Sequence, residues 1–497
     1  MNTFKIANYR PIVIAAVTLA LGIFLAGLSA NNAIGFFVLL GVVIVIAIAS
    51  FFLKFKSLKI GAIFLLLGFI IMSITVGVKT APVLNMENAY FEGRVQNVTK
   101  ATTETKRYVI SDVKLLGEEL NGKLILDVKD DLEIGENIGV IGTFTTIEFD
   151  PLDSYSVSKY TENIRYSSCS EDVIKLGESK KTFIEKIRIK VRKLYLENMG
   201  EEGAIALGLV FGDTSYIDYD TESDMRASGL SHLFSVSGLH VGFMSSIIFM
   251  LFLIFKVEKK KSLVWVSLIL FAYGLLTGFP VGVVRASIMC ILALIAEIQL
   301  VRYDPLNGLA MAVIILLLIN PLDLFSVSFL LSVGAMFGII CFSWSITNLY
   351  KGDNWIVRKL TSAVSVSLAS NAFVFPISCY FFGSFSLYFV VANVFLVPIA
   401  SVVYTLLVPV TLLALIIEPL GILMLPLSMP LLSISSITSL IAQLPLGTLS
   451  LSMPMAASLL FSFGMVVLSK FYMGSKYSKI VLSVLSFITC VLIIFLF

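Results

Sequence analysis

Charged residues and histidines are both scarce in this chain. Lys, Arg, Asp and Glu make up 14% of its 497 residues, whereas 58% are hydrophobic and the mean hydropathy is +0.95. A soluble protein of this length could not bury so much apolar surface, so the composition predicts a polytopic membrane protein. The formal net charge of +3 says little by itself, because the charges are unevenly placed.

Cysteines are also few, and their spacing is not typical of a metal site. Four of the five lie in apolar segments and only Cys169 lies in a polar one, which argues against a disulfide framework. The two histidines, His232 and His240, have no cysteine or carboxylate nearby in sequence to complete a metal site. A Ser–His nucleophile pair would need an orienting acid. We therefore expect no catalytic residue, no metal and no cofactor.

Long hydrophobic runs are abundant, and 13 of them are candidate membrane spans. Each can cross a hydrocarbon core of roughly 30 Å. Three lie in residues 1–80, at about 12–30, 33–53 and 58–78. Ten lie in residues 229–497, at about 231–255, 262–278, 281–301, 306–320, 326–349, 360–382, 386–416, 420–443, 450–470 and 480–497. The predicted fold is mostly α-helical.

Positive residues alternate between the loops and predict the topology. Lys5 and Arg10 precede the first span, and basic clusters such as 256–261 fall where alternation predicts cytoplasm. Loops predicted outside, such as 277–280 and 383–386, contain no Lys or Arg. Because Lys and Arg favour the cytoplasmic side, the N-terminus is expected inside and residues 85–226 outside.

Residues 85–177 have a soluble composition and form an expected β domain outside the membrane. Alternating apolar runs occur at 91–98, 107–113, 123–128 and 137–144, with turn residues between them. Short strands of this spacing predict a small barrel or sandwich, and a five-stranded OB-like barrel fits the size. Acidic residues outnumber basic ones here, whereas single-strand binders need a positive groove. A structural or protein-docking barrel is therefore favoured over a nucleic-acid-binding one.

A connecting region, residues 180–228, begins with a basic amphipathic helix over 180–199. Its apolar residues recur at helical spacing. Its basic residues include Lys186, Arg188, Lys190, Arg192 and Lys193. Such a helix is typical of two roles: it lies on anionic lipid headgroups, or it forms a basic collar that attracts phosphate at a pore entrance. The pattern supports both roles equally.

The stretch 229–242 gathers both histidines, small polar residues and glycines at the mouth of an apolar run. Its candidate site residues are His232, Ser235, Ser237, Gly238, His240 and Gly242. Polar groups and glycine are costly there unless they line a cavity or a protein interface. We therefore expect these residues to line a path, or to form hydrogen bonds between helices or with a substrate.

Arg285 lies within a predicted span and needs a partner there. Its partner is either a structural acid or carbonyl, or a phosphate. Prolines at 280, 376, 398 and 409 predict broken helices. Broken helices are common in transport paths, although kinks that only improve packing are the alternative.

The segment Ser-His-Leu-Phe-Ser-Val-Ser-Gly-Leu-His-Val-Gly, residues 231–242, resembles the signature of the ComEC family of competence proteins, the inner-membrane channels for transforming DNA. Three further motifs resemble those of the family: Gly278-Phe-Pro with Val284-Arg-Ala, Asp304-Pro-Leu-Asn with Asn320-Pro and Ser328-Phe-Leu-Leu-Ser, and Asn393-Val-Phe-Leu-Val-Pro. Leu330 departs from the polar residue that is frequent there. The resemblance is strongest over residues 228–338.

The resemblance implies a channel domain over residues 229–497 that carries single-stranded DNA across the cytoplasmic membrane during natural transformation. It adds Arg285, Asp304, Asn307 and Asn393 to the expected DNA path. It also implies a DNA receptor and a cytoplasmic motor protein as partners. Many family members end in an external metallo-hydrolase domain, whereas this chain stops at Phe497. If one strand is degraded, we therefore expect either that a separate nuclease does it or that this chain is a truncated or specialised family member.

Two other functions stay open on the residues alone. A secondary transporter of a small anionic solute could use the same polar motif, although no inverted repeat is evident. A membrane enzyme acting on a lipid-linked substrate could use the histidines as acid–base groups. The carboxylate nearest to them in sequence is Asp224.

Overall fold

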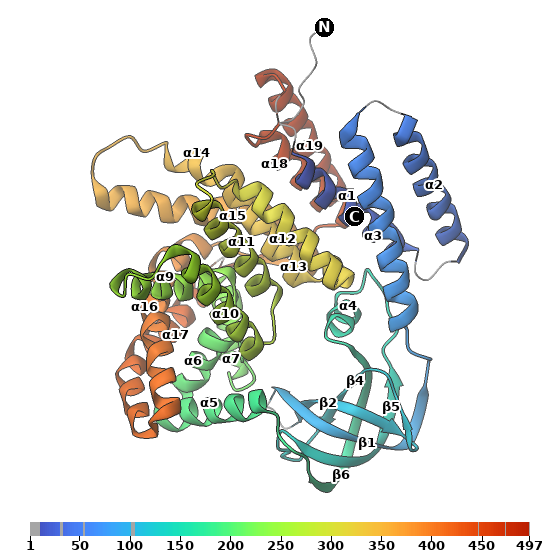
Figure 1. The fold of residues 1–497 in the computed structure, drawn as a ribbon, viewed down its shortest axis with the longest axis vertical. Helices are drawn as coiled ribbons and strands as arrows, with labels where there is room; N and C mark the ends of the chain where they lie inside the picture. Colours follow the sequence, from blue (N-terminus) through green and yellow to red (C-terminus); the bar gives the residue numbers. More distant parts are fainter. Residues whose placement is uncertain are drawn as a thin grey trace.

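The computed structural model describes residues 10–29, 33–52, 55–100, 105–445, 447–472 and 474–496. The chain is mostly helical, with one six-stranded region and a separate pair of short strands (Figure 1). Lys5, on which part of the topology prediction rests, lies outside the described residues.

The N-terminal unit consists of α1 (Pro11–Leu28), α2 (Ala33–Phe52) and α3 (Lys56–Lys79). Glycines allow α1 and α3 to touch along their backbones. A Cβ on Gly22 would lie 2.1 Å from the carbonyl oxygen of Leu65, and one on Gly68 would lie 2.3 Å from that of Leu19. Such small-residue contacts are typical of helices that associate within a membrane.

The β domain contains β1 (Asn85–Lys100), β2 (Lys106–Leu115), β3 (Glu118–Glu119), β4 (Lys123–Val128), β5 (Glu136–Thr146) and β6 (Ile164–Glu178), with α4 (Ser154–Thr161) between β5 and β6. The predicted runs lie in β1, β2, β4 and β5, and β6 is an additional strand. β1 pairs with β2, β2 with β4, β4 with β6, β6 with β5, and β5 with β1. Each of these five strands therefore pairs with two others of the five, and the short β3 pairs with β2 in addition.

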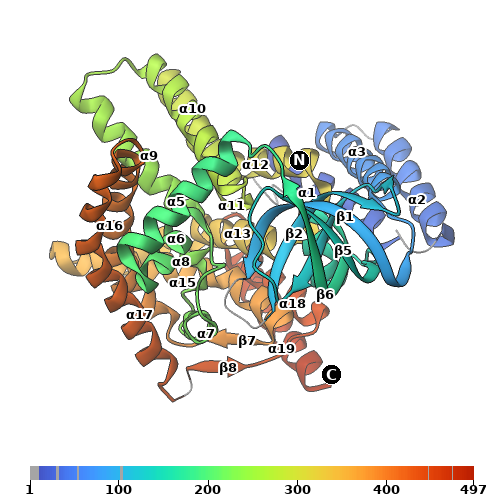
Figure 2. The ribbon, with the colours of Figure 1, turned by 90° about the horizontal axis from the view of Figure 1, so that it is seen from below.

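The connecting region contains α5 (Phe183–Met199), α6 (Glu201–Phe211) and α7 (Tyr219–Ala227). The predicted basic helix begins at Phe183, because Thr182 and Glu185 form a capping box. Figure 2 shows α5 and α6 between the strands and the C-terminal helices. Residues 203–210 of α6 are all buried, so this short helix forms the centre of a core.

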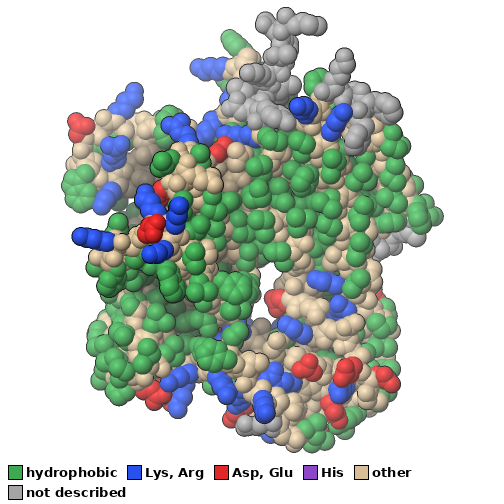
Figure 3. All heavy atoms as spheres, in the orientation of Figure 1, with side chains coloured by type: hydrophobic (Ala, Val, Ile, Leu, Met, Phe, Trp, Pro, Cys, Tyr) green, Lys and Arg blue, Asp and Glu red, His purple; other side chains and the backbone are tan. Residues whose placement is uncertain are grey.

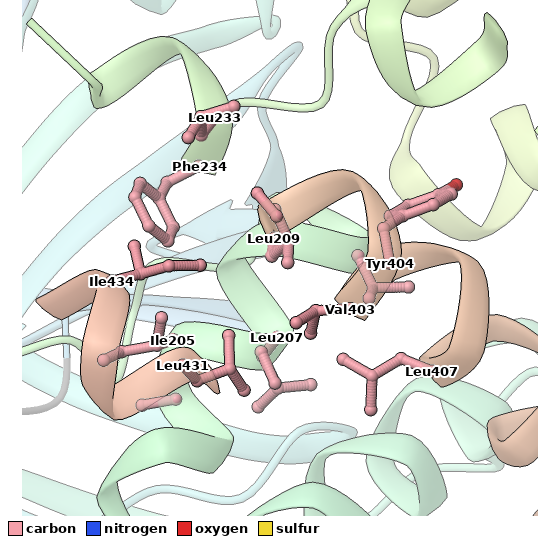
Figure 4. Packing of buried hydrophobic residues seen from close by; sticks show 14 of the residues in the cluster. Ile205, Leu207, Leu209, Leu233, Phe234, Val403, Tyr404, Leu407, Leu431 and Ile434 are labelled. Atoms are coloured by element: carbon pink, nitrogen blue, oxygen red, sulfur yellow. The ribbon is translucent and has the colours of Figure 1, made fainter. Parts of the chain in front are cut away.

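The remaining chain forms α8 (Ser231–Phe234), α9 (Gly238–Ile254), α10 (Lys259–Thr277), α11 (Val281–Ile298), α12 (Pro305–Ile319), η1 (Pro321–Phe325), α13 (Val327–Gly338), η2 (Ile339–Ser343), α14 (Trp344–Thr347), α15 (Trp355–Phe382), β7 (Ser384–Ser386), α16 (Phe389–Ile416), η3 (Glu418–Leu427), α17 (Ser428–Ala442), β8 (Thr448–Ser450), α18 (Met455–Leu468) and α19 (Lys476–Leu496). Figure 4 shows how α6, α8, α16 and α17 meet in one apolar cluster.

Nine helices of the described ranges are long and apolar enough to span a membrane. Four shorter apolar helices accompany them: Ile34–Ser50, Gly238–Ile254, Pro305–Ile319 and Met455–Leu468. Hydrophobic side chains cover much of the helical part in Figure 3, whereas many charged ones lie over the strands. The chain is a multi-pass membrane protein.

Three predicted spans are not single α-helices. The segment 231–255 is interrupted at residues 235–237, between α8 and α9. The segment 326–349 passes through the π-turn η2, and 420–443 begins in the 3₁₀ helix η3, which contains Pro426. The Ser237 cap at the start of α9 accounts for the first departure. The breaks predicted at Pro376, Pro398 and Pro409 are wrong, because these prolines lie inside the continuous helices α15 and α16.

Candidate functional site

The stretch 229–242 folds into a short helix, an extended break and the start of a long helix. α8 ends at Phe234, Ser235 has extended backbone angles, and α9 begins at Gly238. Ser237 caps α9: its Oγ accepts a hydrogen bond from the backbone N–H of Leu239 at 3.3 Å. The cap explains why the helix starts here, because a serine hydroxyl satisfies a free amide of the first turn.

His240 completes the cap from the third helical position. The backbone N–H of Ser237 donates to His240 Nδ1 at 2.9 Å, as a Glu side chain does in the usual capping box. A ring that accepts at Nδ1 carries its proton at Nε2 when neutral. The side chain is 1% exposed, and its ring lies 5.1 Å from the ring of Tyr404 in α16. His240 therefore fixes the start of α9 and packs against α16.

His232 lies differently. Its side chain on α8 is exposed, and Nδ1 lies 3.1 Å from the carbonyl oxygen of Gly229. Ser235, in the break, is also exposed. Over the ranges that the structure describes, no three His, Cys, Asp or Glu side chains form a group that could hold a metal.

Arg285, in the second turn of α11, lies beside the break. Its side chain is buried, and its Nη1 donates to the backbone oxygen of Ser332 in α13. A Cβ on Gly238 would lie 2.7 Å from Nη2. Three residues before Arg285, Gly282 faces the same break, since a Cβ there would lie 3.3 Å from the carbonyl oxygen of Val236. α9, α11 and α13 therefore meet around one guanidinium group.

Among the residues that the structure describes, no carboxylate neutralises the charge of Arg285. None of the ion pairs found among the described residues includes it, and its buried Nε has no hydrogen-bond partner there. The N-terminus of α9, which is partially positive, lies against the guanidinium of Arg285, because Gly238 is the first residue of that helix. An unpaired buried charge is costly, and the nearby helix dipole increases that cost. An anion at this place would relieve both, so the arrangement can hold an anion or let one pass.

Asp304 and Asn307 lie near the other end of α11. From Arg285 to the end of α11 at Ile298 is roughly 20 Å along a helix that rises about 1.5 Å per residue. Asp304 caps α12 by accepting from the backbone N–H of Leu306, and it forms an ion pair with Arg10 at 3.1 Å. The structure therefore does not bring these two residues together with the break.

Asn393 and Gly242 occupy two further positions. Asn393 Nδ2 donates to Ser367 Oγ at 3.1 Å, which joins α16 to α15, while its Oδ1 is buried and without a partner in the described residues. Gly242 is exposed, and a Cβ there would meet no atom within 4 Å. Asn393 therefore lies between two helices, and Gly242 lies at the surface.

The basic residues of α5 do not form an open ring. Arg188 donates to the carbonyl oxygens of Leu275 and Leu276, both at 3.0 Å. Lys190 donates to the Leu415 carbonyl and forms an ion pair with Glu418. Arg192 binds Asp213 and Asn97. The remaining two, Lys186 and Lys193, are exposed. Three of the five therefore fasten α5 to neighbouring elements.

Sequence reasoning missed Tyr404, Gly282 and Asp323. Tyr404 lies against His240, and no pattern marks it within the apolar run of α16. Gly282 comes two residues after Pro280, which precedes α11, so the proline could have suggested Gly282 as a residue at the start of that helix. Asp323, buried in η1, accepts from Asn320 Nδ2 at 2.7 Å, and Asn320 in turn accepts from Lys79 at the end of α3. Asp323 follows the Asn320-Pro motif in the sequence, and this position could have suggested it as a candidate residue.

Comparison with known proteins places this geometry in a family. The model of the family described as competence protein matches residues 209–476, more than half of the 497 residues. ComE operon protein 3 of Bacillus subtilis is 29% identical over 194 residues, 39% of this chain and 24% of that protein. Recombination protein 2 of Haemophilus influenzae is 28% identical over 267 residues, 51% of this chain and 33% of that protein.

These alignments cover a third or less of the length of either relative. No solved structure matches the chain. The matched range nevertheless contains the break, Arg285 and Asn393, which are the parts of the site described above. Because the family model covers the greater part of the chain and the whole of this site, the protein belongs to the competence protein family, the ComEC family that the motif at 231–242 resembles.

Proposed function

We propose that this protein is a channel that carries single-stranded DNA across the cytoplasmic membrane during natural transformation. The observation that carries the proposal is Arg285, which is buried beside the start of α9 and forms no ion pair with the residues that the structure describes, inside the membrane part of a competence-family chain. A strand crossing a bilayer needs cations near its phosphates and no deep binding well. One guanidinium without a carboxylate partner meets that requirement.

The proposed topology has 13 spans, with the N-terminus in the cytoplasm and the β domain outside. The nine long and four short apolar helices support this count, and the alternation of basic loops supports the orientation. We also propose that the β domain is a closed OB-like barrel, since five strands pair in a ring. We propose a structural or protein-docking role for this domain and not DNA binding, because acidic residues outnumber basic ones in it.

Within this channel we assign different roles to the candidate residues. His232, Ser235 and Gly242 are exposed near the break and are proposed to line the path. Ser237 and His240 hold the start of α9, and Gly238 gives Arg285 room. Asn307 and Asn393 each have a buried side-chain oxygen that lacks a partner among the described residues, so they stay candidates for the path, with Asp304 beside Asn307.

The chain itself is proposed to transport and not to catalyse. Its proposed partners are a DNA receptor outside, a separate nuclease and a cytoplasmic motor protein. An enzyme using the histidines has less support, because His240 is buried against Tyr404 and its Nδ1 already accepts from Ser237.

A secondary transporter of a small anionic solute is the second candidate, because an unpaired Arg285 suits any anion. One experiment separates the two. Cells with and without the gene receive a labelled DNA strand, and cytoplasmic label is measured separately from surface-bound label. The channel proposal requires that loss of the gene removes cytoplasmic label and leaves surface label. Unchanged import without the gene would favour the small-solute transporter.

A further inference from the structure

A cavity of about 200 Å³ lies where β1, α5, α6 and α10 meet. Its lining includes Asn97, Thr99, Arg188, Arg192, Asp213 and Thr277. The β domain and the helical part both contribute residues to its lining, so the cavity lies at their junction. Figure 2 shows α5 beside the strands. The volume is below the roughly 300–1,000 Å³ of pockets that enclose drug-sized ligands, and it suits a group of a few heavy atoms.

The cavity contains more positive than negative charge. Arg188 and Arg192 are four residues apart and lie on the same face of α5. The acid that lines the cavity, Asp213, is bound to Arg192 at 2.5 Å. Arg188 has no ion pair within the described ranges. Two guanidinium groups therefore face one carboxylate.

Arg188 keeps a donor for a ligand. Its hydrogen bonds to the two α10 carbonyls use Nε and Nη2, which leaves Nη1. Burial, and then the neighbouring Arg192, hold the pKa of Arg188 below its ordinary value. Both effects disfavour the charged guanidinium, so a bound anion would be stabilised here. Asn97 accepts from Arg192 through Oδ1, and its amide Nδ2 remains as a second donor.

We propose that this junction cavity is a binding site for one phosphate group. Phosphate suits it because guanidinium groups bind its oxygens through several charge-assisted hydrogen bonds, and because the volume excludes a whole nucleotide base with its sugar. The phosphate belongs either to the backbone of a DNA strand or to an anionic lipid headgroup, and the experiment below distinguishes these sources.

The position of the cavity links it to Arg285. Gly212 lines the cavity in a left-handed turn, and a Cβ there would lie 2.6 Å from the side chain of Val236, in the break before α9. Thr277 lines it from the end of α10, four residues before α11 begins. If the phosphate comes from a strand, the inference rests on the proposed function, and the cavity is the phosphate contact that precedes Arg285.

The test uses the full chain, purified in detergent, with variants in matched pairs. Arg188→Gln removes the guanidinium, and its control is Arg226→Gln, an exposed arginine of α7 outside the cavity. Thr99→Glu adds a carboxylate at an exposed position of the lining, and its control is Thr143→Glu, an exposed threonine of β5 outside the cavity. Thr99→Glu keeps the contacts of Arg188 with α10, so it reports on the site if Arg188→Gln unfolds.

Two quantities are measured for each variant. The first is the Kd for a short thymidine oligonucleotide. The second is the increase in Tm on adding phosphatidylglycerol, relative to the increase on adding phosphatidylcholine. A strand site predicts about tenfold weaker oligonucleotide binding for both cavity variants and not for the controls, with an unchanged lipid effect. A lipid site predicts loss of the phosphatidylglycerol effect alone. The inference is overturned if the cavity variants match their controls with both probes. DNA import in cells lacking the gene would instead overturn the proposed function.

Discussion

The guanidinium of Arg285 lies directly against Gly238: a Cβ added to this glycine would be 2.7 Å from Arg285 Nη2. This contact brings the second turn of α11 to the first residue of α9, while Nη1 of the same arginine donates to the Ser332 backbone in α13. Because a side chain at position 238 would require the guanidinium of Arg285 to shift, Gly238 and Arg285 form one unit. Four predictions test this unit and its surroundings.

The charge of Arg285 is expected to be needed for import. Arg285→Leu should reduce cytoplasmic DNA at least about tenfold, since one phosphate contact is lost, and Arg285→Lys should keep part of the activity because it keeps the charge. Arg226→Leu, an exposed arginine of α7, is the control. The amount of each protein in the membrane is measured alongside. If Arg285→Leu only removes the protein from the membrane, the arginine has a structural role.

A larger side chain at position 238 should displace the guanidinium of Arg285. Gly238→Ala is expected to lower import and Gly238→Leu to stop it, while DNA still binds the cell surface. Gly77→Ala, at an exposed position of α3 outside the proposed path, serves as the matched control, because a Cβ there meets no atom within 4 Å. Parental import by a well-expressed Gly238→Leu variant would show that the break is not the narrow part of the path.

The cap formed by His240 should contribute to stability. His240→Leu leaves the Ser237 N–H without its acceptor and is expected to cost about 1 kcal/mol or more, from the usual cost of losing a cap or a buried hydrogen bond. His240→Asn can still accept from Ser237 and should lose less. His232→Leu, at an exposed position, should leave Tm unchanged. Thermal unfolding of the purified proteins compares the three, and an equal Tm for all would remove the capping role.

Cys169 is an internal probe of topology, since it is a free, exposed cysteine in the β domain. An impermeant maleimide should label intact cells through Cys169, and Cys169→Ser should abolish the signal. In that background, a cysteine at the exposed Lys260 should react only after permeabilisation. The opposite labelling pattern would reverse the proposed orientation.

The sequence by itself determined the features that depend on neighbours along the chain. Composition and run length were enough to identify a membrane protein, because the cost of apolar surface in water is local and additive. Alternation located β1, β2, β4 and β5, and the Ser-His-Leu-Phe-Ser-Val-Ser-Gly motif identified the family. The helix over 180–199 was also predicted, and its start moved only to the Thr182 cap.

The tertiary structure decided which of these residues meet. Arg188, Lys190 and Arg192 looked like a collar, but their long side chains reach α10, η3 and β1, elements from other parts of the chain. Arg285 and Asp304 both stay candidates for the path, but Arg285 lies in the second turn of α11 and Asp304 follows the end of that helix, so the two do not lie at one point. The partner of a charge is set by distances through space to residues far away in sequence, and periodicity records only the side of a helix on which each residue lies.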